Sequence, residues 1–360
     1  MLYYLLLFAY MVFVQFISRN HKGNDVFLMV ITFLPLFLFG ALRVNCGDYE
    51  IYEQYNSWVR SSGNNIYDVI ERMEPGYAML NKFLPYRWII ILSSLLACYA
   101  YGVLFIKLVP KQYRWFGMIL FFLVGDKTFY FLFSSIRNSI AISILMLYMT
   151  YRITKREIKH SWVKELIILV AATALAYSIH ASALVFFPIA FLMTLNGKVT
   201  NTEHFVWLAL LVLLWIVPVD TIIGTGFFSD YEYFERYDEY LERAHNTGML
   251  AKMGATIFAL LCLVDIRNNS DRRDSVVSRL ALIFVYSYLL GGLNIRTSQY
   301  YVIFIIVYLV GVYIDRNKTA WSMALLAFAI VFLFYSSFVA GTFGSAIYSP
   351  FVNYRISLSV

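Results

Sequence analysis

Charged residues are scarce in this chain, and their scarcity defines its class. They make up 14% of the 360 residues, whereas hydrophobic residues make up 61% and aromatic residues 19%. A typical soluble domain has about 25% charged residues, most of them on its surface. A water-soluble globule of this composition would lack the polar residues to cover its surface, so the sequence predicts an integral membrane protein.

Cysteines and nucleotide-binding motifs are also sparse. The three cysteines, Cys46, Cys98 and Cys262, are too widely separated for a disulfide framework or a metal cluster. The chain has no Gly-rich phosphate loop and no Asp-x-Asp motif. We therefore expect no metal and no cofactor. The net charge of +7 comes mainly from basic loops between apolar runs, and we expect no nucleic-acid partner.

Long apolar runs recur along the whole chain. A helix of about 20 apolar residues crosses the hydrocarbon core of a bilayer. The sequence thus predicts an all-α, polytopic fold of about twelve transmembrane helices in a single domain, 1–360. The first run has no basic region before it and no cleavage site after it, so it is expected to be retained. The predicted spans are 2–17, 26–42, 88–109, 115–133, 140–151, 162–177, 181–195, 204–217, 249–264, 276–290, 300–313 and 320–340.

Short basic connections set the expected orientation. With twelve crossings and both ends outside, the lysines and arginines of these connections fall on one side, which is then cytoplasmic. Two regions leave the boundaries open. The run 162–195 is too long for one span, and a hairpin turning at 178–180 fits it better. In 113–151 the turn falls either at 125–127 or at 134–137.

The opposite side carries the polar residues that point to function. The stretch 43–77 gathers acids, arginines and tyrosines between two apolar segments. The loops at about 43–87 and 218–248 are predicted to form the roof of a site. Arginine has a planar fork of donors that matches phosphate geometry. Five arginines on this side are therefore candidates to hold a pyrophosphate: Arg43, Arg137, Arg236, Arg243 and Arg296.

Several short motifs follow one another along the chain. They are Arg43 with Gly47-Asp48, Tyr52 and Tyr55; Glu74-Pro75-Gly76-Tyr77; Ser135 to Ala141; His180 to Leu184; Arg236-Tyr237 with Tyr240-Leu241; and Ile295-Arg296. In this order they resemble the EpsG-type, Wzy-like polysaccharide polymerases, from about residue 40 to 310. Asn138 departs from the resemblance, because glutamine is expected there.

This resemblance implies a polymerase of O-antigen or another surface polysaccharide. Such an enzyme would transfer a growing glycan from undecaprenyl pyrophosphate to the non-reducing end of a new lipid-linked repeat unit. It would work on the outer face of the bacterial inner membrane, in an extracytoplasmic cavity like that of GT-C glycosyltransferases. Its expected partners are the undecaprenyl-pyrophosphate-linked oligosaccharide, membrane lipid and a chain-length regulator protein. The pathway would be polysaccharide or lipopolysaccharide biosynthesis.

The chemistry of such a transfer assigns roles to residues. A carboxylate or an imidazole takes the proton of the attacking hydroxyl, and Asp48, Glu74 and His180 are the candidates. Cations stabilise the leaving pyrophosphate, and Arg137 and Arg296 are the first choices because each lies at the margin of an apolar helix. Arg43, Arg236 and Arg243 would bind the second pyrophosphate. Tyrosines on the same side, including Tyr52 and Tyr237, would stack on sugar rings.

Structural roles compete with these assignments. Arginines and tyrosines at helix ends often anchor a protein at the membrane interface. Asp48 is also placed to cap a turn or helix, and His180 to form a hydrogen bond at a hairpin tip. Arg236 and Arg243 are also placed to pair with glutamates on a solvated helix. Two other functions stay open: a flippase or transporter of the lipid-linked unit, and an O-antigen ligase or other GT-C glycosyltransferase.

Overall fold

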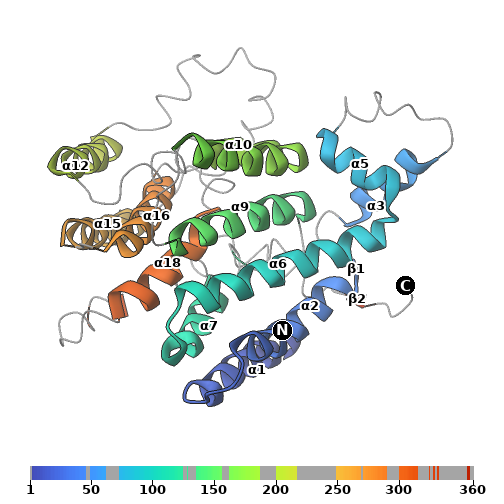
Figure 1. Ribbon diagram of the computed structural model, residues 1–360, viewed down its shortest axis with the longest axis horizontal. Coiled ribbons are helices and arrows are strands. Elements are labelled where there is room, and N and C mark those ends of the chain that lie inside the picture. The colour runs from blue at the N-terminus through green and yellow to red at the C-terminus, as the bar shows by residue number, and fades with distance from the viewer. Residues whose placement is uncertain are drawn as a thin grey trace, which may run out of the picture. The chain divides into compact units, whose positions relative to one another are not determined.

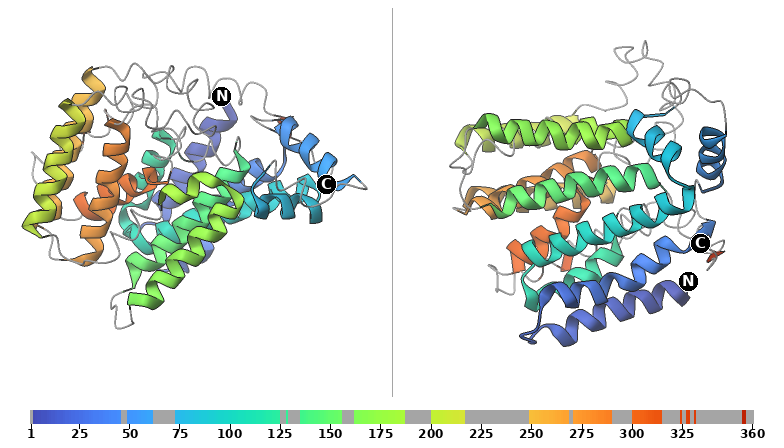
Figure 2. Two further views of the ribbon diagram at one scale, coloured as in Figure 1. Left: turned by 90° about the horizontal axis from the view of Figure 1, so that it is seen from above. Right: turned by 45° about the vertical axis from the view of Figure 1, so that its right-hand side comes forward.

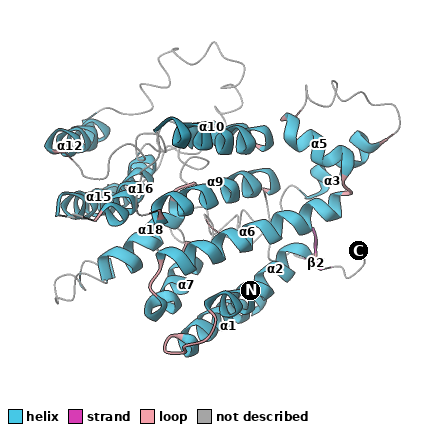
Figure 3. Cartoon of the chain, viewed as in Figure 1, coloured by secondary structure: helices cyan, strands magenta, loops and turns pink. Residues whose placement is uncertain are grey.

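The computed structural model describes most of the chain as helix, with one short pair of strands (Figure 3). It describes residues 2–45, 49–61, 73–124, 128, 135–155, 162–186, 200–216, 249–268, 271–289, 300–314, 324, 327–328, 331 and 355–356. These residues belong to two compact units. The first comprises 1–191 and 341–360, and the second comprises 192–340.

The first unit is a layer of long helices with two short ones at one end. In this layer α1 packs on α2, α2 on α6, α6 on α9, and α9 on α10, as the right-hand view of Figure 2 shows. The helices α3 and α5 lie beside the first residues of α6 (Figure 1). The bounds are α1 (Leu2–Ser18), α2 (Asp25–Ala41), α3 (Tyr49–Arg60), α5 (Pro75–Phe83), α6 (Tyr86–Leu108), α7 (Arg114–Leu123), α9 (Ile136–Thr154) and α10 (Trp162–Ile179).

Aromatic side chains fill the core of this layer. Phe33 of α2 stands edge-on to Phe121 of α7, with ring centroids 6.2 Å apart. Tyr101 of α6 meets the same Phe121 ring at 4.9 Å. Such edge-to-face pairs place the positive ring edge against the negative face of the neighbour. The core therefore fixes α2, α6 and α7 against one another.

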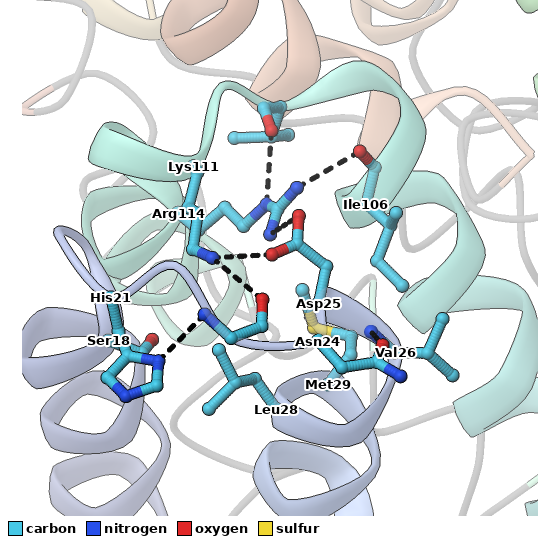
Figure 4. Close-up of polar contacts among 12 residues, drawn as sticks. Ser18, His21, Asn24, Asp25, Val26, Leu28, Met29, Ile106, Lys111 and Arg114 are labelled. Carbon is cyan, nitrogen blue, oxygen red and sulfur yellow. Dashed lines mark hydrogen bonds and ion pairs between the residues drawn. The ribbon is translucent and has the colours of Figure 1, made fainter.

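The basic connections of this unit meet at the end of the layer away from α3 and α5. Asp25, the first residue of α2, binds Lys111 Nζ at 2.6 Å and Arg114 Nη1 at 3.0 Å (Figure 4). Arg114 also donates to the carbonyls of Ile106 and Val109, which α6 leaves unpaired at its C-terminus. One buried arginine thus joins two connections that the sequence places on the same side.

The same end also holds α9 and α10 together. Glu165 of α10 binds Arg152 Nη1 at 2.7 Å and Lys155 Nζ at 3.1 Å. The Arg152 and Glu165 side chains are almost fully buried. A buried pair of this kind is costly to break, because one charge would then be left without its partner.

The first unit also contains a short two-stranded sheet. The strand β1 (Arg43–Asn45) pairs antiparallel with β2 (Arg355–Ile356) from the other end of the chain. Arg87 of α6 donates from Nη1 to the carbonyl of Arg43 at 2.6 Å. The segment that leads into α3 is therefore held by both the chain terminus and α6.

The second unit is built from α12 (Asn201–Ile216), α15 (Met249–Asn268), α16 (Arg272–Leu289) and α18 (Val302–Val307), which continues as the π-helical segment η4 (Tyr308–Tyr313). Glu203 of α12 binds the guanidinium of Arg279 at 2.7 Å and 2.9 Å. The Tyr308 hydroxyl donates to the carboxylate of Asp265. Polar pairs thus link the helices of this unit internally.

The helical class predicted from composition is confirmed, whereas the twelve predicted membrane crossings stay a prediction. By length and composition, α6 is the one described helix that could cross a membrane in full. Several predicted spans, including 26–42, 88–109 and 162–177, coincide with helices to within a few residues. The spans 181–195 and 320–340 lie largely outside the described residues. Within the first of them, 181–185 forms the 3₁₀ helix η2 (Ala181–Val185).

Two predicted boundaries are wrong. The span 115–133 is not one helix, because α7 ends at Leu123 and the Thr128 hydroxyl turns back to the carbonyls of Phe121 and Val124. The span 140–151 is too short, because α9 already begins at Ile136. Arg137 therefore lies in the first turn of a helix and not in the turn before it, which fixes the direction of its side chain.

Candidate active site

Glu74 lies at the centre of a cluster of polar side chains from four segments. It is the N-cap residue of α5, and Pro75 is preorganised for the first helical position. Its side chain does not cap its own helix. Instead, Oε1 lies 3.2 Å from His180 Nδ1 and accepts the Ala181 N–H at 3.0 Å. Its Oε2 lies 2.5 Å from Arg137 Nη1.

Gly76 permits the close approach that places this carboxylate. A Cβ atom at position 76 would lie 2.4 Å from the Ser178 hydroxyl and 2.8 Å from the Ser178 carbonyl oxygen. A backbone carbonyl in the last turn of α10 cannot move aside easily. Only glycine therefore lets the first turn of α5 rest against the end of α10, next to His180.

Arg137 joins the cluster from the first turn of α9. Its Nε donates to the Tyr52 hydroxyl at 3.1 Å, while Nη1 is paired with Glu74. Its guanidinium lies 5.3 Å from the centroid of the Tyr52 ring and 5.7 Å from that of Tyr77, within cation–π range. The third nitrogen, Nη2, makes no hydrogen bond to the part of the chain that the structure describes. Both N–H groups of Nη2 are therefore candidates to bind a ligand.

The surroundings of Glu74 lower the pKa of its carboxyl group. Burial alone would raise the pKa of Glu74, but the hydrogen bonds from His180 and the Ala181 N–H and the charge of Arg137 outweigh it, and the pKa falls to about 2. Glu74 is therefore ionised at neutral pH. An anionic partner favours the His180 tautomer with the proton on Nδ1, and that tautomer carries its lone pair on Nε2.

Tyrosines from α3 and α5 form a wall of the cluster. The Tyr52 and Tyr77 rings meet edge to face at 5.7 Å, and both are buried. They belong to a core cluster that also includes Ile136 and Ile179, which flank Arg137 and His180 in the chain. Burial raises the pKa of Tyr77 far above its ordinary value, so its hydroxyl stays protonated. The site is thus apolar on one side and charged on the other.

Arg43 is described but lies apart from these contacts. Its side chain is 1% exposed in β1, near Tyr49 and Tyr86. Within the described residues, no hydrogen bond or ion pair joins Arg43 to Glu74 or Arg137. Its expected contact with a pyrophosphate stays a prediction.

The structure thus brings together four of the predicted site residues, Tyr52, Glu74, Arg137 and His180, from positions up to 128 residues apart in the chain. Apart from Arg43, the other predicted residues lie outside the described residues, and their roles stay predictions. They are Asp48, Arg236, Tyr237, Arg243 and Arg296.

Other members of the cluster were missed by the sequence reasoning. The Ala181 N–H is a backbone group, and no residue type signals it. Tyr77 was part of a recognised motif but was not assigned to the site. Gly76 belongs to the same motif, and the sequence does not predict its close contact with Ser178. The described residues include no group of three His, Cys, Asp or Glu side chains that could hold a metal ion.

Comparison with known proteins identifies one family. Residues 26–356 match the model of the EpsG family, so the match covers nearly the whole chain. No curated protein and no solved structure matches the chain. The matched region contains every residue of the Glu74 cluster.

Proposed function

Because this chain belongs to the EpsG family, we propose that it is a glycosyltransferase that polymerises a surface polysaccharide. The donor is a growing glycan on undecaprenyl pyrophosphate, and the acceptor is the non-reducing end of a new repeat unit on a second carrier. The reaction takes place at the outer face of a bacterial inner membrane. Family membership supports the polymerase class, and the Glu74 cluster supports the chemistry.

The observation that carries this proposal is the carboxylate of Glu74 between Arg137 and His180. In the transfer, a sugar hydroxyl attacks the anomeric carbon and the bond from that carbon to the phosphate oxygen breaks. The electron pair of that bond leaves with the pyrophosphate, and the hydroxyl proton passes to a base. The cluster offers a base and a cation within one hydrogen-bonded unit.

His180 is the base that suits this reaction best. A carboxylate with a pKa of about 2 takes up protons poorly at neutral pH, which argues against Glu74 in that role. Glu74 instead orients the imidazole and stabilises the positive charge that forms on it, as the aspartate does in a Ser-His-Asp triad. Asp48 stays an alternative base.

Arg137 is the candidate to stabilise the leaving pyrophosphate. Glu74 and Tyr52 fix the plane of its guanidinium, so Nη2 is preorganised toward a ligand. A donor that is already in place stabilises developing charge without reorganisation. In the full proposal, Arg296 assists it, Arg43, Arg236 and Arg243 contact the second pyrophosphate, and Tyr237 stacks on a sugar.

The arrangement of charges in the first unit supports the proposed orientation. The basic connections around Arg114 and Arg152 meet at one end of the helices, and the Glu74 cluster lies at the opposite end. By the preference of lysine and arginine for the cytoplasmic side, the cluster would face outward. About twelve spans, a GT-C-like cavity and a chain-length regulator as partner complete the proposal.

A gene deletion tests the class of activity. Surface glycan from the deletion strain is resolved on a gel, and a polymerase predicts that long chains vanish while a single repeat unit still reaches the surface or the carrier. If even the single unit is lost from the outer face, the protein is a flippase. If long chains accumulate on the carrier but are not attached to their final acceptor, it is a ligase.

Purified enzyme with lipid-linked repeat units tests the residues. Arg137→Ala and Arg296→Ala should abolish chain growth, and normal product length in both would remove the phosphate assignment. Among Asp48→Asn, Glu74→Gln and His180→Ala, a variant that keeps a near-wild-type rate excludes that residue as the base. We expect His180→Ala to be the slowest of the three.

A further inference from the structure

Asn56 links three helices through a buried amide. It lies on the inner face of α3, and its side chain is nearly fully buried. Its Nδ2 donates to Leu84 O at 2.9 Å and to Asn81 Oδ1 at 3.0 Å. Its Oδ1 accepts the Tyr86 N–H at 3.1 Å. A buried amide with this many partners is costly to replace, because each partner would lose a hydrogen bond away from water.

The partners of Asn56 are the ends of two other helices. Leu84 is the C-cap of α5, and Tyr86 is the first residue of α6. The last carbonyls and the first N–H groups of helices have no partner within their own helix. Pro85, which lies between them, has no N–H to donate. One side chain from α3 therefore caps α5 and α6 at the corner where they join.

Asn81 fixes the orientation of that amide. Its own Nδ2 donates to the Tyr77 carbonyl at 2.8 Å, one turn earlier on α5, so its Oδ1 is directed at Asn56. The Asn81 side chain is 0% exposed. A pair of buried amides with both orientations satisfied defines one geometry and rejects alternatives.

This corner also carries two groups of the candidate site. Tyr52 lies on α3 one turn before Asn56, and Glu74 begins α5, whose far end Asn56 caps. Both groups are bound by Arg137. Figure 1 shows α3 and α5 as the two short helices beside the start of α6. The angle between these helices therefore sets the distance between the Tyr52 hydroxyl and the Glu74 carboxylate.

We propose that Asn56, together with Asn81, is the positioning device of the candidate site. The two amides hold α3 against α5, so that Tyr52 and Glu74 both bind the guanidinium of Arg137. Neither amide touches the reacting atoms. The catalytic meaning of this role rests on the proposed polymerase activity, whereas the geometric role does not.

The test measures whether the Glu74 environment depends on Asn56. Melting temperature of the purified full-length protein is followed from pH 7 downward, in wild type and in Asn56→Leu. Each is compared with its own Glu74→Gln partner, so that the difference isolates the contribution of Glu74. In wild type this contribution should be lost only as the pH falls from 4.5 toward 2. In Asn56→Leu the loss should move up toward pH 4.5.

Gln15→Leu is the matched control. Gln15 is also a buried amide, and it donates to Thr32 at 2.7 Å between α1 and α2 of the same unit. Its loss should lower the melting temperature at every pH. It should leave unchanged the pH range over which the contribution of Glu74 to the melting temperature is lost, which we call the Glu74 step. If Asn56→Leu behaves in the same way, Asn56 is only a stabilising residue and the proposal is wrong.

Asn81→Ala keeps the experiment decisive if Asn56→Leu does not fold. That variant retains the bonds of Asn56 to Leu84 and Tyr86 and removes only the orienting partner. It should move the Glu74 step in the same direction by a smaller amount, and an unchanged step contradicts the proposal.

Activity provides a separate readout. A loosened Tyr52–Arg137–Glu74 geometry should slow chain growth by about 100-fold with little change in KM, since misplacement by about 1 Å has this effect in other enzymes. If the step moves but the wild-type protein does not polymerise glycan, the proposed function fails and the positioning role stands. If wild type polymerises and Asn56→Leu keeps its rate, the positioning role fails alone.

Discussion

Replacing Glu74 by Gln probes the charge at the centre of the candidate site. The amide has almost the same shape and still accepts the Ala181 N–H, but it carries no charge for Arg137. The fall of the Glu74 pKa from 4.5 to about 2 corresponds to about 3 kcal/mol in favour of the ionised form. The side chains of Glu74 and Arg137 are 16% and 22% exposed, so screening by solvent reduces this to about 2 kcal/mol.

The sign of the pH dependence follows from the direction of that change. A carboxylate whose folded-state pKa is lowered contributes stability above its unfolded value of 4.5, and the contribution is lost as the pH falls toward 2. At pH 7 the Glu74→Gln variant should therefore melt roughly 4 °C below wild type. The two curves should converge as the pH falls from 4.5 toward 2, because the wild-type carboxylate in the folded protein becomes protonated only near pH 2.

The assay is thermal unfolding of detergent-solubilised protein, followed by tryptophan fluorescence at half-unit pH steps. Glu50→Gln makes the same chemical change at an exposed site on α3 and should leave the melting curve unaltered. If the melting temperatures of wild type and Glu74→Gln differ by the same amount at every pH from 7 to 2, the ion pair is refuted. Lower stability of the variant at pH 3 with equal stability at pH 7 would show that the sign is wrong.

Three further predictions concern single contacts. Gly76→Ala should separate α5 from the Ser178 carbonyl and cost about 2 kcal/mol in unfolding free energy, with chain growth lost; wild-type melting and rate would contradict the close approach. Arg137→Lys keeps the charge but loses the fork, so the rate of chain growth should fall about 100-fold, and a near-wild-type rate would show that a point charge suffices. Arg114→Leu should lower the melting temperature by leaving Asp25 with only one cation, while product length in the polymerisation assay stays normal.

The composition and the order of the motifs were sufficient for the class of the protein. An apolar chain with few charges forms helices that satisfy their own backbone hydrogen bonds, and this needs no knowledge of tertiary contacts. The placement of Glu74, Arg137 and His180 on one side also followed, because alternate connections of consecutive spans lie on the same side. Family membership agrees with the predicted class of the protein.

Helix boundaries were less well predicted, because several apolar residues near them could continue either a helix or a turn. The beginning of α9 at Ile136 was missed, since the serines before it are equally suited to a loop. The predicted span 115–133 runs past the end of α7 at Leu123, although Gly125-Asp126-Lys127 interrupts the apolar run and a turn at 125–127 is one of the two alternatives that the sequence leaves open. Hydropathy reports burial in the membrane or the core, and it does not report where a backbone stops being helical.

The sequence by itself predicted that Glu74, Arg137, His180 and Tyr52 lie on one side of the helices, because residue type and the alternation of connections between apolar runs can be read without tertiary contacts. Only the tertiary structure shows which of these side chains contact one another. The contacts of Glu74 with His180, Arg137 and the Ala181 N–H lower its pKa, which is why we propose His180 and not Glu74 as the base. The sequence gives no sign of a role for Asn56, because its side chain can cap α5 and α6 only once the ends of both helices pack against it. Electrostatics and capping depend on distances between segments, and folding alone sets those distances.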